Sequence, residues 1–263
     1  MGALPPFSPI LNRLLASLAG EDVSISKLGD LIEKDTVLAG NLLHLVNSGL
    51  YMLRGEVNSV RHAVSLLGID KLRNAVLGMS LTRMWKKASM PASWSTADFN
   101  LHSAATAVLC DLLAQRLPVR YPEGAFVAGL LHDVGRLVIA LSLPEEYERI
   151  RHLRESRGYS NLESEQEALG FTHPELSADV LAFWNLPEPI QTAVRYHHRV
   201  HLDNTICKSG EIPLSHVLDV ANQFTNSMTS ANPVLPESLA LDALGLVLEE
   251  FQREFDSMKP FFR

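Results

Sequence analysis

The stretch VAGLLHDVGRLVIA, residues 127–140, places a histidine and an aspartate side by side within an apolar segment. Burying the imidazole of His132 beside the carboxylate of Asp133 costs free energy unless each group finds a partner. Either the fold supplies hydrogen bonds to both groups, or a metal ion binds them. If the stretch forms one helix, the two side chains project about 100° apart, so they reach a common object only within a concave cluster of helices.

The composition is that of a globular protein with one large domain or two small ones, since 46% of its 263 residues are hydrophobic and 20% are charged. The net charge of -7 gives no overall attraction for nucleic acid, so we expect no direct nucleic-acid binding. Two isolated cysteines, Cys110 and Cys207, exclude a disulfide framework and suit a reducing cytoplasm. The start MGALPPFSP lacks the regions of a signal peptide, and no apolar run reaches the length of a membrane span. We therefore expect a cytoplasmic protein without membrane contact.

Almost every periodic segment predicts a helix, and none shows the alternation of a half-buried strand, so the predicted fold is all-α. Lysines, serines and a proline interrupt the pattern over residues 86–98. This break predicts an N-terminal helical subdomain over 1–95 and a second helical array, with C-terminal helices, over 96–263. The helices expected in the second array span roughly 96–117, 123–143, 145–157, 161–169, 173–185, 188–198, 213–229 and 236–257.

Other segments supply further candidate metal ligands. Asp98 and His102 are spaced i,i+4 and share one face of a predicted helix. His173 begins a helical segment, and the pair His197–His198 ends another. Imidazole and carboxylate groups on facing helices suit zinc, iron or manganese. Spacing alone nevertheless favours ordinary roles, with Asp98 as an acidic first-turn residue and the histidines as hydrogen-bonded core groups or solvated helix ends.

The order of three motifs resembles the HD superfamily of metal-dependent phosphohydrolases, and more closely its HD-related output domain, HDOD. These motifs are LHSAATA (101–107), GLLHDVGRL (129–137) and EALGFTHPELSADVLAFWNLPEPIQTAVRYHH (167–198). The earlier stretch LGDLIEKDTVLAGNLLHLVNSGLY (28–51) is similar to the N-terminal helical region of HDOD proteins. The likeness covers about residues 4–225 and implies an HD-like all-α fold with a role in bacterial signal transduction, with other signalling proteins as partners.

The resemblance also implies roles for individual residues. The positions of metal ligands are His102, His132, Asp133, His173, His197 and His198, with Asp98 where some relatives carry an additional acidic ligand. Arg136 stands where the cyclic-dinucleotide phosphodiesterase branch has a lysine that meets substrate phosphate. The closing aspartate of HD enzymes aligns with Asn222, one turn after Asp219, and HHRVHLDNT replaces that branch's glycine-tyrosine-proline motif.

The neutral amide of Asn222 balances cation charge less well than a carboxylate, so we expect a degraded site with one or two divalent metals (iron, manganese or zinc) or none. The first functional hypothesis is a non-catalytic signalling module of HDOD type, with a nucleotide as a candidate ligand. The alternative is a metal-dependent phosphohydrolase acting on a nucleotide or cyclic dinucleotide. In that enzyme Arg136 and one of His197 and His198 would contact phosphate or act as a general acid. A generic helical interaction module ranks third.

Overall fold

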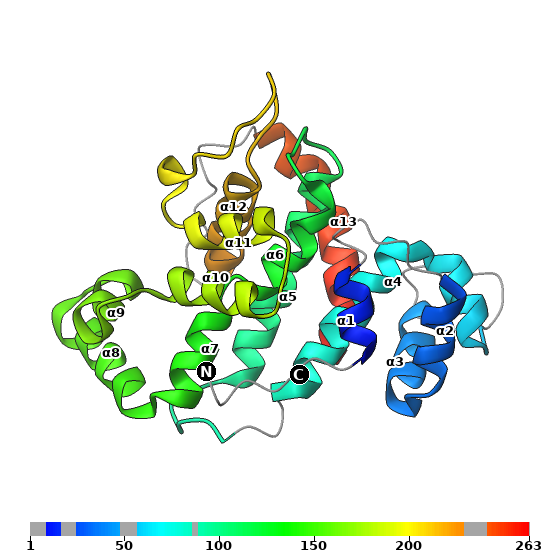
Figure 1. Cartoon of the computed structure of the whole chain (residues 1–263), viewed down its shortest axis with the longest axis horizontal. Helices are drawn as coiled ribbons and strands as arrows, with labels where there is room; N and C mark the ends of the chain where they lie inside the picture. The colour runs from blue at the N-terminus through cyan, green and yellow to red at the C-terminus, as the bar shows by residue number, and fades with distance from the viewer. Residues whose placement is uncertain (1–8, 17–24, 48–56, 86–88, 229–240, 263) are drawn as a thin grey trace.

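The computed structural model describes residues 9–16, 25–47, 57–85, 89–228 and 241–262. Within these ranges the chain is helical, and its only β-type pairing is one isolated bridge between Val119 and Ile212. The predicted all-α fold is confirmed. In Figure 1 the N-terminal helices lie on one side of the central helices, and α8 and α9 lie on the opposite side.

The first half of the chain forms four helices: α1 (Pro9–Ala16), α2 (Ile25–Glu33), α3 (Thr36–Asn47) and α4 (Val60–Trp85). Asp35 caps α3, because its Oδ1 accepts hydrogen bonds from the backbone N–H groups of Val37 and Leu38 at 3.2 and 3.1 Å. Gly68 adopts φ 72° and ψ 175° and kinks α4. That conformation is readily adopted by glycine, so this one residue separates two helical pieces.

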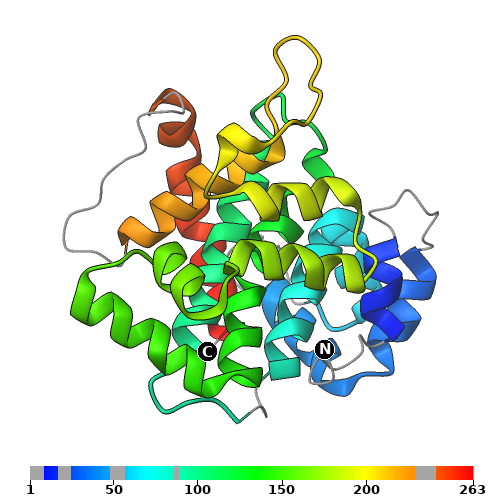
Figure 2. The ribbon, with the colours of Figure 1, turned by 60° about the vertical axis from the view of Figure 1, so that its left-hand side comes forward.

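The second half is built around α5 (Thr96–Ala114), which is buried along most of its length and packs against α6, α12 and α13. Figure 2 shows α10 and α11 side by side across one face. The helices after α5 are α6 (Ala125–Leu131), α7 (Val134–Ser142), α8 (Pro144–Arg157), α9 (Asn161–Leu169), α10 (His173–Phe183), α11 (Glu188–Tyr196), α12 (Leu214–Met228) and α13 (Leu241–Met258). Where the described residues test them, their bounds lie within a few residues of the predicted ones, with one exception. The predicted start of the last helix, over residues 236–240, lies outside the described residues.

The exception is the predicted helix over 123–143, which is two helices. α6 ends at Leu131, α7 begins at Val134, and His132 and Asp133 form the turn between them. The expectation that both residues lie on one helix is therefore wrong. Asp133 has φ −101° and ψ 10°, and this departure from helical geometry lets its side chain and that of His132 join the same cluster of polar groups.

Two glycines that flank this turn explain how closely the neighbouring helices approach it. A Cβ on Gly129 would lie 2.6 Å from the Cα of Ala107 in α5. A Cβ on Gly135 would lie 2.4 Å from the carbonyl oxygen of His173, and the Gly135 N–H donates a hydrogen bond to Ser177 Oγ at 2.8 Å. Any larger residue would push α5 or α10 away from the His132–Asp133 turn.

The stretch Pro122–Ser142 contains an 18-residue window that is long and apolar enough to cross a membrane by length and composition. The expectation that no apolar run reaches this length is therefore wrong. Within the fold, 83% of this apolar window is buried. Its hydrophobicity is accounted for by packing, because α6 lies against α5 and α7 lies against α10.

Candidate metal centre

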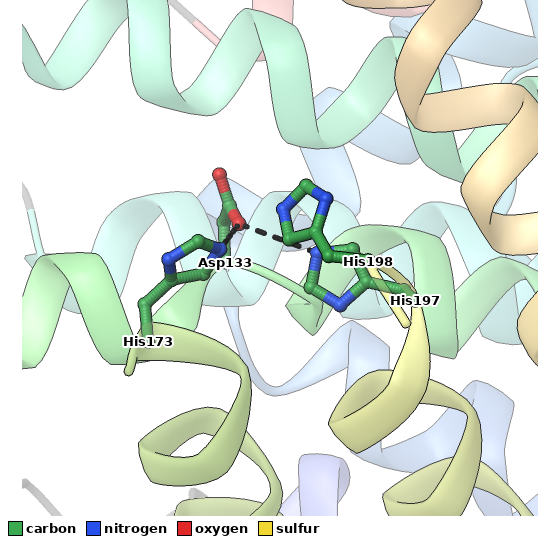
Figure 3. Close-up of side chains that lie close together, drawn as sticks. All are labelled: Asp133, His173, His197 and His198. Carbon is green, nitrogen blue, oxygen red and sulfur yellow. Dashed lines mark ion pairs between the residues drawn. The ribbon is translucent and has the colours of Figure 1, made fainter. Parts of the chain in front are cut away.

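Side chains from four separate parts of the chain converge beside the turn between α6 and α7. His102 comes from α5, His173 is the first residue of α10, and His197 follows α11. The structure brings candidate ligand atoms within 4.8 Å of one another in two groups that share Asp133. The groups are Asp133, His173, His197 and His198, drawn in Figure 3, and His102, His132 and Asp133.

Asp133 is the centre of this arrangement, and its side chain is only 4% exposed. Its Oδ1 lies 3.2 Å from His173 Nε2, 3.5 Å from His132 Nε2 and 3.9 Å from His197 Nε2. Its Oδ2 accepts a hydrogen bond from Arg136 Nη1 at 2.8 Å. One carboxylate oxygen is therefore held by a guanidinium, and the other faces three imidazoles.

Backbone carbonyls fix the orientation of two of these imidazoles. His132 Nδ1 lies 2.8 Å from Gly129 O, and His197 Nδ1 lies 2.7 Å from Val194 O. A carbonyl oxygen only accepts, so Nδ1 carries the proton, and in the neutral ring Nε2 is left with its lone pair. Each donor is the residue that follows a helix end, and each acceptor lies three residues earlier in that helix.

Glu165 in α9 orients the third imidazole and is the functional residue that the sequence analysis misses. Its carboxylate oxygens lie 2.7 and 2.9 Å from His173 Nδ1, and its Oε2 also accepts from the His173 backbone N–H at 2.7 Å. Glu165 is buried on the face of α9 between Leu162 and Leu169, at i,i+3 and i,i+4 spacing from them. A charged residue at a core-facing helical position is the signal that could have revealed it.

Burial and charge set the protonation states. Burial lowers the pKa of His132 to about 4. Burial alone would raise the pKa of Asp133, but His132 and Arg136 outweigh burial and hold that pKa well below its usual range. Burial would likewise lower the pKa of His173, but Asp133 and Glu165 outweigh it and raise the pKa of this imidazole. At neutral pH, His132 is thus neutral and Asp133 is ionised. Among the imidazoles around Asp133, that of His173 takes up a second proton most readily.

The centre contains buried acceptors without donors. Asp133 Oδ1, His173 Nε2 and His197 Nε2 are buried and have no hydrogen-bond partner among the described residues. A second proton on His173 would serve Asp133 Oδ1 but would leave the His197 lone pair unpaired. A divalent cation would satisfy all three atoms at once, so the donor set fits a metal ion.

The remaining predicted ligands lie at different distances from this centre. His198 is exposed at its rim, with its ring centroid 4.0 Å from that of His197. Asn222 is buried and accepts a hydrogen bond from Asn226 Nδ2 at 2.9 Å. Burial lowers the pKa of His102, and the amide of Asn222 opposes this larger effect by favouring the protonated imidazole. Asp219 accepts from Gln223 Nε2 at 2.8 Å and belongs to neither group of candidate ligands.

Asp98 lies apart from the cluster. It is exposed in the first turn of α5, where its backbone N–H donates to the capping Ser95 Oγ at 3.2 Å. It therefore occupies the acidic first-turn position that the sequence analysis weighs as the alternative to a ligand role. The interval of four residues places Asp98 and His102 on one helix face, but only His102 reaches the centre.

The fold and the centre define an all-α protein with an HD-type histidine–aspartate cluster. A model of the HDOD domain matches residues 4–200. The chain belongs to the HDOD family.

Two curated relatives share part of their length with this chain. An uncharacterised protein of Treponema pallidum (strain Nichols) is 24% identical over 203 residues, which are 75% of this chain and 38% of that protein. The uncharacterised protein YuxH of Bacillus subtilis (strain 168) is 27% identical over 142 residues, which are 51% of this chain and 34% of YuxH. The match thus spans little more than a third of each relative.

Three solved structures resemble nearly the whole chain. An HDOD domain protein of unknown function from Geobacter sulfurreducens has a TM-score of 0.77 at 23% identity, covering 98% of this chain and 92% of that one. A protein designated a candidate phosphohydrolase from Shewanella amazonensis SB2B has a TM-score of 0.78 at 22% identity, covering 100% and 96%. A candidate signal transduction protein from Marinobacter aquaeolei VT8 has a TM-score of 0.73 at 25% identity, covering 98% of this chain and 60% of that one.

Proposed function

We propose that this chain is a non-catalytic signal-transduction module of the HDOD family whose histidine–aspartate centre holds one divalent metal ion. The observation that carries the proposal is the set of three buried acceptor atoms, Asp133 Oδ1, His173 Nε2 and His197 Nε2, that have no donor among the described residues. Imidazoles with their Nδ1–H groups already engaged present Nε2 to a metal, and outer partners such as Glu165 hold the rings in place.

The charge of the centre favours one metal ion over two. Asp133 and Glu165 contribute two negative charges, Arg136 contributes one positive charge, and neutral imidazoles contribute none. One divalent ion brings this set close to neutrality, whereas a second would leave a large uncompensated charge in a buried site. The neutral ligands also favour zinc or ferrous iron over magnesium or calcium, which prefer oxygen.

The same features argue against catalysis of the HD type. The position of the closing aspartate carries Asn222, whose Oδ1 is already engaged by Asn226. Arg136 pairs with Asp133 through Nη1, so its positive charge is already compensated by a buried carboxylate and attracts a substrate phosphate less strongly. In the proposed module the metal stabilises the meeting point of α5, α7, α10 and α11, and signalling partners bind the outer helical surfaces.

A metal-dependent phosphohydrolase is the second candidate, favoured by the exposed imidazole of His198 at the rim of the centre. A bound divalent ion would stabilise charge on phosphoryl oxygens. Desolvation lowers the pKa of His198 to about 4, so this imidazole would be neutral and placed to contact a phosphate oxygen or the attacking water. Arg136 would contact phosphate with the N–H groups that Asp133 does not engage. A nucleotide or a cyclic dinucleotide would be the substrate.

One experiment separates the two candidates. The purified chain is loaded with manganese, ferrous iron or zinc, its metal content is measured by elemental analysis, and hydrolysis of nucleotides, cyclic dinucleotides and a chromogenic phosphodiester is followed. The module predicts about one ion per chain and no turnover. Turnover that disappears in His132→Ala but persists in His152→Ala, an exposed histidine of α8, would establish the enzyme instead.

A further inference from the structure

A second cavity lies directly behind the metal centre. It occupies about 290 Å³ between α7, α8 and α9, and Ser93 in the segment before α5 closes one side. Figure 1 shows these three helices together at one edge of the molecule. Two of its lining residues, Arg136 and Glu165, are the residues that hold Asp133 and His173.

One of the arginines in the cavity wall has no acidic partner within the described part of the chain. Three arginines and two glutamates line the cavity. Arg136 pairs with Asp133, and Arg151 pairs with Glu148 and Glu155. Arg154 makes no ion pair with any residue that the structure describes, so its guanidinium is available to an anion from outside the chain.

The rest of the wall suits a flat apolar group. Ile139 and Ile150 line the cavity together with the ring of Tyr147. The Tyr147 ring is itself held by an edge-to-face contact with Trp94, at a centroid distance of 5.6 Å and an interplanar angle of 68°. Asn161 adds an amide that can both donate and accept hydrogen bonds.

The volume limits the ligand. At about 290 Å³ the cavity stands at the lower end of the range for small-molecule pockets, roughly 300–1,000 Å³. This size matches a single nucleoside monophosphate more closely than a cyclic dinucleotide.

We propose that this cavity binds a small organic phosphate with a flat ring, of the size of a nucleoside monophosphate. Its phosphate pairs with Arg154 and its ring packs against Tyr147 and Ile150. Arg136 and Glu165 line the cavity and also hydrogen-bond to the metal centre. A ligand bound in the cavity therefore also changes the contact of Arg136 with Asp133 and that of Glu165 with His173. This coupling rests on the proposed metal-bound state, whereas ligand binding itself does not.

The test measures binding of AMP and GMP to the full chain by calorimetry, with adenosine, ribose 5-phosphate and inorganic phosphate as truncated probes. We expect the mononucleotides to bind at least about tenfold more tightly than any truncated probe. Arg154→Glu weakens mononucleotide binding at least about tenfold, because it replaces the free cation with an anion. Arg157→Glu is the matched control, since it makes the same change in charge on α8 outside the cavity.

Three outcomes would overturn the proposal: no mononucleotide binds, inorganic phosphate binds as tightly as AMP or GMP, or the two arginine variants lose affinity equally. Metal content is measured in the same samples, and mononucleotide binding is repeated after chelation. A chain that binds AMP through Arg154 without holding metal would refute the proposed metal site but leave this pocket standing. A chain that holds metal and binds no mononucleotide would refute the pocket alone.

Discussion

Two polar clusters lie against α5, one buried and one half-exposed, and they are built differently. At the turn between α6 and α7, Asp133 is surrounded by imidazoles whose Nδ1–H groups are engaged elsewhere. Between α4, α5 and α13, Asp111 and Glu254 share a cluster with Lys71, Asn74 and Gln115. There Gln115 Nε2 donates to Asp111 Oδ2 at 2.9 Å, and Lys71 Nζ lies 3.4 Å from Glu254 Oε1.

The difference lies in the supply of donors. The cluster around Asp111 has its own amide and ammonium donors. The cost of burying the Asp111 carboxylate is seen in its pKa. Burial and the nearby Glu254 raise the pKa of Asp111 to about 6. Among the described residues, that cluster holds a single buried acceptor without a partner, Asn74 Oδ1, whereas three such atoms converge at Asp133. The proposed metal ion would satisfy all three together. Several converging acceptors, and not one unpaired atom, thus set the proposed cation site apart from an ordinary polar cluster.

The largest expected effect comes from Asp133→Asn, which removes the carboxylate that both groups of candidate ligands share. Metal content should fall from about one ion per chain to below about a tenth. The unfolding free energy should fall by about 2–3 kcal/mol, because Arg136 loses its carboxylate while remaining partly buried. Elemental analysis and urea denaturation measure both effects. Asp98→Asn, an exposed change on α5, should alter neither, and equal losses in the two variants would contradict the account.

Gly135→Ala should disturb the centre without removing a ligand. The added Cβ would meet the His173 carbonyl oxygen at 2.4 Å, so α7 and α10 must separate. We expect a loss of about 1–2 kcal/mol in unfolding free energy together with weaker metal binding. The control is Gly29→Ala in α2, where a Cβ meets nothing within 4 Å and the better helix propensity of alanine favours folding. A Gly135→Ala variant as stable as wild type would show that the helices do not need this close approach.

Glu165→Gln tests the outer partner of His173. The amide accepts a hydrogen bond from His173 Nδ1 but no longer carries charge, so metal affinity should fall about 10–100-fold while the fold is kept. Competition with a chromogenic chelator measures the affinity. Glu167→Gln, on an exposed part of α9, provides the comparison. Equal affinities in the two variants would remove Glu165 from the centre.

Asp111→Asn should have the smallest effect and acts on the other cluster. Because the pKa of Asp111 is raised from 3.8 to about 6, the folded chain keeps a proton that the unfolded chain has lost. Wild-type stability contributed by this group is therefore complete below about pH 4 and declines as pH rises through about 6. The variant should lack this decline and be about 1–2 kcal/mol more stable at pH 7.

Denaturation curves at several pH values measure this effect, and metal content should stay unchanged. Asp256→Asn is the matched control, because Asp256 is exposed and accepts from Gln252 at the same i,i+4 spacing as the Asp111–Gln115 pair. A pH dependence that persists in Asp111→Asn would assign the titration to another group.

Apolar periodicity was sufficient to predict the all-α fold and most helix bounds, because each helix buries a stripe of regular spacing. It could not predict the break at His132 and Asp133. Apolar residues continue on both sides, and neither proline nor glycine stands at the turn itself. The two flanking glycines act through tertiary contacts with α5 and α10, which no local pattern reports.

The candidate site was predictable only in part, for similar reasons. His102, His132, Asp133, His173, His197 and His198 are brought together as the family resemblance implies, although spacing alone favoured ordinary histidines. Asp98 shows the limit of the i,i+4 spacing. That spacing predicts that two residues share a helix face, but it does not predict whether both of them reach the centre. Glu165 was missed because its role depends on contact with His173, the first residue of the next helix.

The most direct test of the central claim is anomalous X-ray diffraction from crystals of the purified chain loaded with zinc or ferrous iron. The account predicts one anomalous peak per chain, within bonding distance of Asp133 Oδ1 and of Nε2 atoms of the surrounding imidazoles. No peak at the centre, or two peaks bridged by Asp133, would contradict a site built for a single divalent ion.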